Sequence, residues 1–217
     1  MVTNGLVLAL DAANPRSYVS GSAIWYDRSG NNNGTLINGP VFDSSSLGSI
    51  AFDGIDDYVL TPYSGSASGD FTFSVWALNS TISDKVVASR GRDGRGSGFS
   101  GALSFQATGN LGAAIIANGV QFSAIGGSYT SNQWYNITGV WKSGISISLY
   151  VNGYFVSQTN TSNTILRSST DGWVLASITT SLYYSVKVAN LIVYDRALTD
   201  LEVLQNYRAL KSRYNPE

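Results

Sequence analysis

Apolar and polar residues alternate along most of this chain, and short runs of Gly, Asn, Asp and Ser separate the alternating segments. A period of two places every second side chain on one face, which is typical of a β-strand half buried in a sheet. The pattern predicts strands at residues 6–10, 50–52, 58–60, 71–78, 85–89, 102–106, 111–117, 119–125, 134–142, 145–151, 154–157, 172–176 and 186–194. Residues 25–40, rich in Asn and Gly, are predicted to form a loop.

Turn residues sit between several of these segments. The pairs Gly109–Asn110 and Asn118–Gly119 separate three apolar runs, and Asn152–Gly153 separates two more. Asn-Gly between apolar runs is a strong local signal for a β-hairpin. We therefore expect residues 102–125 to form an antiparallel meander.

One helix is predicted, at residues 199–213. Thr199 and Glu202 have the spacing of a capping box, in which each side chain bonds the other residue's amide. Leu201, Leu204 and Leu210 recur at helical spacing, which predicts one face packed on the body of the protein. Many strands with a single terminal helix indicate an all-β jelly-roll β-sandwich of two antiparallel sheets. Residues 1–217 are taken as one domain with the helix packed on it.

Residues 50–60 place three carboxylates close together between two apolar arms. Asp and Gly favour tight turns, so this stretch is predicted to be a hairpin whose turn fixes the register of two strands. Calcium prefers six to eight oxygen ligands, and carboxylates and amides supply them. The alternative is that these residues only form turns. The candidate calcium ligands are Asp27, Asn31, Asp53, Asp56 and Asp57.

Composition excludes several kinds of chemistry. The sequence has no Cys and no His, which rules out disulfides, thiolate nucleophiles, Ser-His-Asp triads and histidine-bound zinc. The formal charge of −1 does not favour a nucleic-acid partner. The N-terminus lacks the basic region of a signal peptide, and no apolar run is long enough to cross a bilayer. We expect a protein that acts inside the cell or leaves it by lysis or assembly into a particle.

Six segments in a fixed order carry a family resemblance, although no single one of them is specific. They are residues 25–36, 52–59, 71–76, 134–141, 149–153 and 192–199. From about Gly5 to Tyr214 the chain resembles the laminin-G-like, concanavalin A-like lectin/glucanase superfamily. The resemblance implies a jelly roll, often a calcium ion near a rim, and carbohydrate binding by loops. The nearest likeness is to free-standing domains of tailed phages and marine viruses, where such domains serve as head decorations, fibres or tail adhesins.

An enzyme is not expected. Glycosidases usually need two carboxylates flanking the scissile bond. The glucanases of this superfamily carry their acids on one strand as Glu-x-Asp-x-Glu or a close variant. Here Glu occurs only at Glu202 and Glu217, in or after the predicted helix, and no strand has two acids at i and i+2. A degenerate glycosidase is therefore the least favoured alternative.

Two groups of side chains are candidates for ligand binding. Arg90, Arg92 and Arg95 lie on a glycine-rich stretch and are able to hold a sulfate, phosphate or sugar carboxylate bidentately. A solvated loop and a contact to a neighbouring subunit are the alternatives. Tyrosines in or near loops are the second group, because an exposed aromatic ring suits the apolar face of a sugar. These are Tyr129, Tyr183 and Tyr184, with Tyr63 and the rim loop 178–184 also considered.

The leading hypothesis is a non-catalytic virion surface protein, a capsid decoration, head fibre or tail adhesin, that binds host or environmental glycans. The expected partners are capsid or fibre proteins and a cell-surface glycan, without nucleic acid or membrane insertion, and a homo-oligomer is left open. Calcium is the one expected cofactor. The alternative is an extracellular, stand-alone bacterial carbohydrate-binding module. The sequence does not name a ligand.

Overall fold

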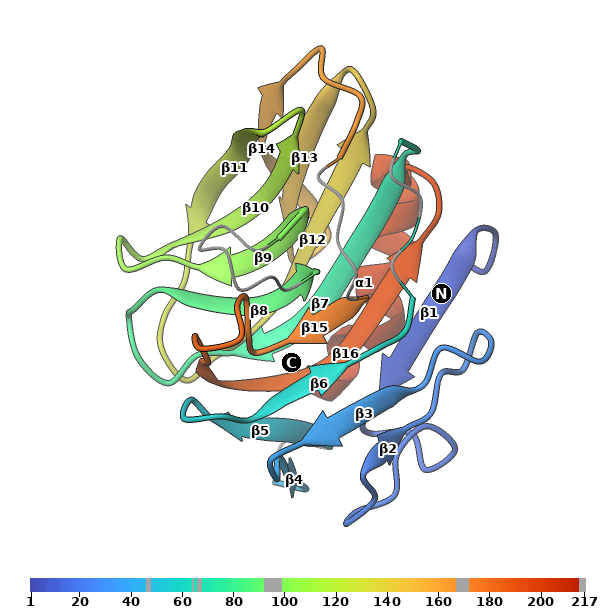
Figure 1. Ribbon diagram of the computed structural model, residues 1–217, viewed down its shortest axis with the longest axis vertical. Helices are drawn as coiled ribbons and strands as arrows, with labels where there is room; N and C mark the ends of the chain where they lie inside the picture. The colour runs from blue at the N-terminus through green and yellow to red at the C-terminus, as the bar shows by residue number, and fades with distance from the viewer. Residues whose placement is uncertain (46–47, 64, 66–67, 92–98, 167–171, 215–217) are drawn as a thin grey trace.

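The computed structural model describes residues 1–45, 48–63, 65, 68–91, 99–166 and 172–214. They form two antiparallel β-sheets stacked face to face, with one helix behind them (Figure 1). This arrangement confirms the predicted jelly-roll sandwich with a C-terminal helix.

The back sheet has eight strands among the described residues. In spatial order they are β14 (Tyr154–Asn160), β13 (Ser146–Val151), β12 (Trp134–Lys142), β7 (Phe71–Leu78), β16 (Ser185–Tyr194), β5 (Ser49–Asp53) and β4 (Val41–Asp43), while β1 (Leu6–Asp11) also pairs with β16.

The front sheet likewise has eight strands in the part of the chain described. In spatial order they are β11 (Val120–Ser128), β10 (Asn110–Ala117), β9 (Gly101–Phe105), β8 (Lys85–Arg90), β15 (Trp173–Leu175), β6 (Tyr58–Leu60), β3 (Gly34–Ile37) and β2 (Ile24–Trp25).

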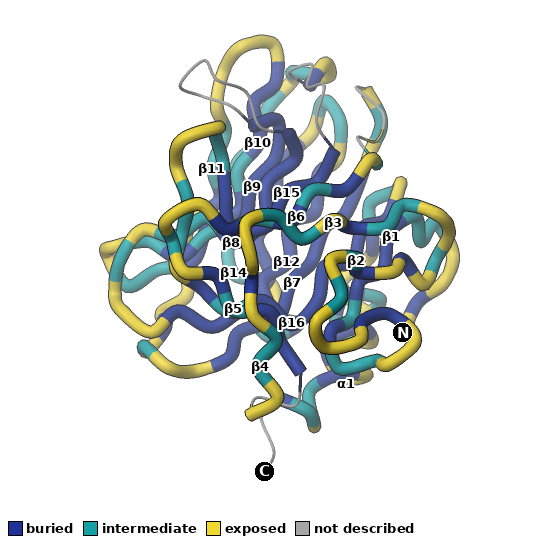
Figure 2. Tube along the Cα trace, turned by 60° about the horizontal axis from the view of Figure 1, so that its bottom comes forward, coloured by how far each residue is buried: buried dark blue, intermediate teal, exposed yellow. Residues whose placement is uncertain are grey.

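The core lies between the two sheets, and it includes the fully buried side chains of Phe73, Phe105 and Trp141. Buried residues follow the strands of both layers, while most connecting loops are exposed (Figure 2). Gly139 of β12 is the direct partner of Phe73 on the neighbouring strand β7, and the Phe73 ring lies over it, so an added Cβ would meet that ring at 2.6 Å. The close approach explains why glycine occupies a central strand here.

The predicted meander is confirmed as β9, β10 and β11, which pair antiparallel in sequence. At the β10–β11 turn, Asn118 and Gly119 both have positive φ, 49° and 78°. This is the geometry of a tight hairpin turn that Asn and Gly favour.

The prediction of a hairpin at residues 50–60 is wrong. β5 pairs with β16 and β4 in the back sheet, whereas β6 pairs with β15 and β3 in the front sheet. The acidic turn therefore carries the chain from one sheet to the other. Two short apolar arms and a turn look alike in sequence whether the arms pair or separate, so local signals could not distinguish the two.

The prediction of a plain loop at residues 25–40 is also incomplete, because this stretch contains part of β2 and the whole of β3. β3 pairs with β6 through Thr35, Leu36 and Ile37. Four residues are too few to show a clear alternation, and these strands depend on their neighbours for stability.

The helix α1 (Asp200–Tyr214) packs on the outer face of the back sheet, away from the front sheet (Figure 1). Its capping box forms as predicted: Glu202 Oε2 accepts from the Thr199 amide at 2.9 Å, and the Glu202 amide donates to Thr199 Oγ1 at 3.4 Å. Arg196 binds the same carboxylate at 2.6 Å and is the main reason that the pKa of Glu202 falls to about 2. Among the described residues, no helix has the length and apolar character needed to cross a membrane.

Candidate functional site

A groove on the outer face of the front sheet, over β8–β11, is the candidate functional site. Side chains alternate along these strands. Leu103 and Ala113 point into the core, while Ser104 and Ala114 lie on the groove. The groove has a volume of about 290 Å³. The floor of the groove lies close to the backbone of β9 and β10, because small residues occupy the outward positions of these strands. They are Ala102, Ser104, Gly112 and Ala114.

Two glutamine amides are among the polar groups that line the groove. Gln106 Nε2 donates to Ser104 Oγ at 2.6 Å, and Gln121 Nε2 donates to Ser123 Oγ at 3.0 Å. A Cβ on Gly112 would lie 3.2 Å from Gln106 Nε2, so glycine leaves room for that amide. Each glutamine amide has a second N–H and a carbonyl oxygen, so together they can donate to and accept from a ligand.

The rim of the groove combines an aromatic ring with a carboxylate. Tyr184 and Ile178 come from the loop before β16, and Asp84 comes from the loop before β8. The Asp84 carboxylate accepts from the Ala107 amide at 2.8 Å. Burial, and then the nearby Asp84 charge, raises the pKa of Tyr184. The Tyr184 hydroxyl therefore stays protonated at neutral pH and can donate to a ligand.

The structure corrects the expectation that Tyr129 offers an exposed ring. Tyr129 is only 6% exposed and packs edge-on against Phe105 at 4.7 Å. Its hydroxyl accepts from the Ser83 amide at 3.1 Å and donates to the Gln106 carbonyl at 3.2 Å. Tyr129 therefore holds two rim segments in place from below instead of presenting its ring to a ligand.

Tyr183 is half-buried, its ring 6.0 Å from that of Tyr58, and its hydroxyl donates to the Thr180 carbonyl at 2.9 Å. The structure thus places Tyr184, but not Tyr183 or Tyr129, among the residues that line the groove. Of the predicted rim loop 178–184, Ile178 and Tyr184 line the groove.

Arg90 is not on an open loop. It ends β8, is only 6% exposed, and its guanidinium carbon lies 5.3 Å from the centre of the Phe71 ring. Burial lowers the pKa of Arg90 to about 10. It lines a separate cavity of about 170 Å³ together with Tyr63 and Trp173. Arg92 and Arg95, predicted to act with it, lie outside the described residues.

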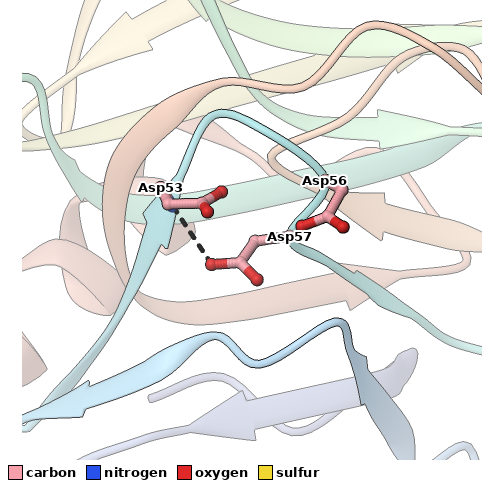
Figure 3. Close-up of side chains that lie close together, drawn as sticks. All are labelled: Asp53, Asp56 and Asp57. Carbon is pink, nitrogen blue, oxygen red and sulfur yellow. Dashed lines mark hydrogen bonds between the residues drawn. The ribbon is translucent and has the colours of Figure 1, made fainter.

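The three carboxylates of the acidic turn do come together. Asp53, Asp56 and Asp57 offer oxygens that lie within 4.8 Å of one another, on the inner side of the bend (Figure 3). Asp57 Oδ2 accepts from the Asp53 amide at 3.1 Å, and Asp53 Oδ1 accepts from the Ile55 amide at 2.8 Å. Asp57 is buried, and its pKa is raised by that burial and then by the two neighbouring carboxylates.

Asp27 and Asn31 do not join this cluster. Asp27 is buried and accepts from the amides of Ala9, at 2.9 Å, and Ser29, at 2.8 Å. Ala9 pairs with Ile192 of β16, whereas Asp53 pairs with Ser185. Seven residues of strand separate those two positions, on the order of 20 Å. The expectation that the two loops form one calcium site is therefore wrong, and Asp27 instead binds its loop to β1.

Sequence reasoning missed most of the groove residues, among them the polar residues Asp84, Ser104, Gln106, Gln121 and Ser123. The sequence signal for these residues was the outward face of the predicted meander, where small and polar residues alternate with residues of the core. The alternation in β9, β10 and β11 does not show which face the back sheet covers, so it could not place the groove.

Comparison with known proteins identifies the family. Residues 53–204 match the family model described as the concanavalin A-like lectin/glucanases superfamily. Because the match covers more than half of the chain, the protein belongs to this superfamily. No curated protein matches the sequence.

Solved structures with the same fold include two very different proteins. Trypanosoma rangeli sialidase superposes with a TM-score of 0.71 and 17% identity, over 97% of this chain and 33% of the sialidase. The receptor-binding domain of the botulinum neurotoxin C/D mosaic serotype superposes with a TM-score of 0.71 and 14% identity, over 96% of this chain and 52% of that domain. The chain thus spans about a third and about half of these structures, and the likeness is one of fold.

Proposed function

We propose that this protein is a non-catalytic, lectin-like domain that binds a glycan in the groove over β8–β11. The observation that carries the proposal is the groove itself, with small residues on its floor, two glutamine amides and the Tyr184 ring at its side. Ligand pockets usually measure about 300–1,000 Å³. At about 290 Å³ the groove lies at the lower limit of this range, which suits a short segment of a glycan.

The groove chemistry fits a neutral sugar. Hydroxyl groups both donate and accept hydrogen bonds, as the amides of Gln106 and Gln121 do. An aromatic ring such as that of Tyr184 suits the apolar face of a sugar ring. The sialidase and neurotoxin likenesses support the proposal only by sharing the fold.

The absence of catalysis is part of the proposal. Glycosidases usually act through two carboxylates about 5–9.5 Å apart across the scissile bond. Among the described residues that line the groove, Asp84 is the single carboxylate, and its Oδ1 already accepts from a backbone amide. This supports binding without hydrolysis.

We further propose that the domain is displayed on the surface of a virus particle, attached to a capsid or fibre protein. The support is the resemblance of the ordered sequence segments to phage and marine-virus domains, and a formal charge of only −1, which gives no electrostatic reason to bind the packaged nucleic acid. Measuring the binding of the purified protein to virus particles and to a glycan array distinguishes a structural role on the particle from glycan recognition. Particle binding without glycan binding would indicate architecture alone, and glycan binding without particle binding would indicate a free carbohydrate-binding module.

Replacing Tyr184 by alanine should weaken binding of the best array glycan by about threefold to tenfold, because aromatic contacts contribute about 0.5–1.5 kcal/mol. Calorimetric titration measures the change. Tyr184→Phe keeps the ring and should stay within about twofold of the wild type. Equal affinity in Tyr184→Ala and the wild type would remove Tyr184 from the site.

Calcium binding at Asp53, Asp56 and Asp57 stays a prediction. Its support is that carboxylate oxygens of these three residues lie close together. If calcium binds, the melting temperature should rise by about 5 °C or more when calcium exceeds its Kd about a hundredfold. The same melting temperature in excess calcium and in excess chelator would contradict the prediction.

Two variants separate the effect of the ion from the effect of charge. The raised pKa of Asp57 means that protonated Asp57 favours the folded state below about pH 4, and that this contribution is lost as the pH rises through the folded-state pKa. Asp57→Asn should therefore raise the melting temperature in chelator at neutral pH and remove the response to calcium. Exposed Asp56→Asn should also remove the calcium response but raise the melting temperature in chelator by less, because burial, ahead of the Asp56 charge, is the main cause of the raised pKa of Asp57.

A further inference from the structure

Another cavity lies on the opposite side of the molecule from the groove, between the C-terminal half of α1 and strands β1 and β16. Its volume is about 340 Å³. In Figure 1 the helix lies behind β16, with β1 next to it. The cavity is therefore separated from the groove by both sheets and is independent of the glycan proposal.

The base of this cavity is apolar. Ala9 and Ile192 are direct partners in the β1–β16 pairing, and Leu210 comes from the helix. All three are buried, with exposed fractions of 5%, 6% and 9%. Along β1, Leu8 and Leu10 fill the core, so Ala9 lies on the opposite face toward the helix. Its short side chain leaves the room that a larger residue would fill.

The rim of the cavity is cationic. Arg213 lies at its edge and is paired with Asp11 at 2.8 Å. Arg28 also lies at the edge, is exposed, and its guanidinium makes no hydrogen bond or ion pair within the described residues. Among the side chains that line the cavity, two arginines and one aspartate leave one positive charge that is not neutralised.

Arg28 is held at the rim by the backbone. Its amide donates to the Ala9 carbonyl at 2.8 Å, and the Ala9 amide donates to the buried carboxylate of Asp27 at 2.9 Å. These two bonds place Arg28 beside the apolar base. A cation beside a half-enclosed apolar surface is the arrangement that receives an anionic group attached to an apolar body.

We propose that this cavity binds a small amphiphilic anion. The apolar part of the ligand would contact Ala9, Ile192 and Leu210, and its carboxylate, sulfonate or phosphate group would lie against Arg28. Asn14 at the rim offers an amide that can donate to the same group.

Anilinonaphthalene sulfonate, an apolar double ring bearing one anionic group, is a suitable probe. Its fluorescence on titration into the intact protein measures binding. Arg28→Gln should raise the Kd about threefold to fivefold, which corresponds to the upper range for an exposed ion pair. Ala209→Trp should abolish saturable binding, because exposed Ala209 lines the mouth of the cavity and an indole there would block it.

Two matched controls test the location. Arg208→Gln removes the same charge from an exposed helix residue that does not line the cavity, and Ala114→Trp places the same bulk in the groove. Both should bind the probe with wild-type affinity. No saturable binding by the wild type, or wild-type affinity in either Arg28→Gln or Ala209→Trp, would overturn the proposal.

Discussion

Replacing Trp76 by alanine should lower the free energy of unfolding by about 3–5 kcal/mol, the usual cost of removing a fully buried large aromatic side chain. Trp76 is 0% exposed and lies on the outer face of the back sheet, under the helix. Its ring is stacked on Tyr207 at 5.6 Å and lies 4.7 Å from the ring of Tyr214. The change therefore removes the surface on which two aromatic residues of α1 rest.

Thermal or denaturant unfolding measures this loss, and the melting temperature should fall by more than about 6 °C. Trp76→Phe should cost much less, since it keeps an aromatic ring and Trp76 Nε1 has no hydrogen-bond partner among the described residues to lose. The prediction that Leu201 lies on the packed face of the helix is wrong, because Leu201 is 77% exposed. Leu201→Ala should therefore change stability by less than about 0.5 kcal/mol. A loss below about 1 kcal/mol in Trp76→Ala would show that the helix is not anchored at this point.

Filling the groove should have the largest effect on binding. Ala114 of β10 is half-buried and lies on the groove floor. Ala114→Trp should weaken glycan binding at least about tenfold, because the indole would occupy the space that the ligand needs, and each tenfold step corresponds to about 1.4 kcal/mol. Calorimetric titration checks the change. Ala209→Trp, with the same bulk on the helix side, should leave glycan binding unchanged.

The hairpins were predictable because their signals are local. Asn118–Gly119 and Asn152–Gly153 adopt the positive φ angles that their residue types favour, and the strands on either side pair with each other. The capping box at Thr199 and Glu202 is local in the same sense. Such features depend on residues a few positions apart, which is the range that sequence patterns describe well.

The errors came from contacts between residues far apart in the chain. Asp53 and Tyr58 are separated by a short turn, yet β5 binds β16 and β6 binds β15. Tyr129 lies near a loop, yet it is buried. Its hydroxyl forms hydrogen bonds with Ser83 and Gln106, which belong to other segments of the chain. In each case the partner lies far away in the sequence, and no local pattern records such a contact.

The groove illustrates the same limit. Alternation in β9 and β10 predicts two faces for each strand, but it does not say which face a second sheet covers. Small residues such as Ala102 and Ala114 fit a core as well as a groove floor. Only the position of the back sheet shows that Leu103 and Ala113 point inward and leave the opposite face open.

A glycan array probed with the wild type, Ala114→Trp and Ala209→Trp in parallel tests the central proposal most directly. The wild type and Ala209→Trp should retain the same class of glycan, and Ala114→Trp should retain none. The proposal would be contradicted if the wild type bound no glycan, or if Ala114→Trp bound the same glycans as strongly as the wild type.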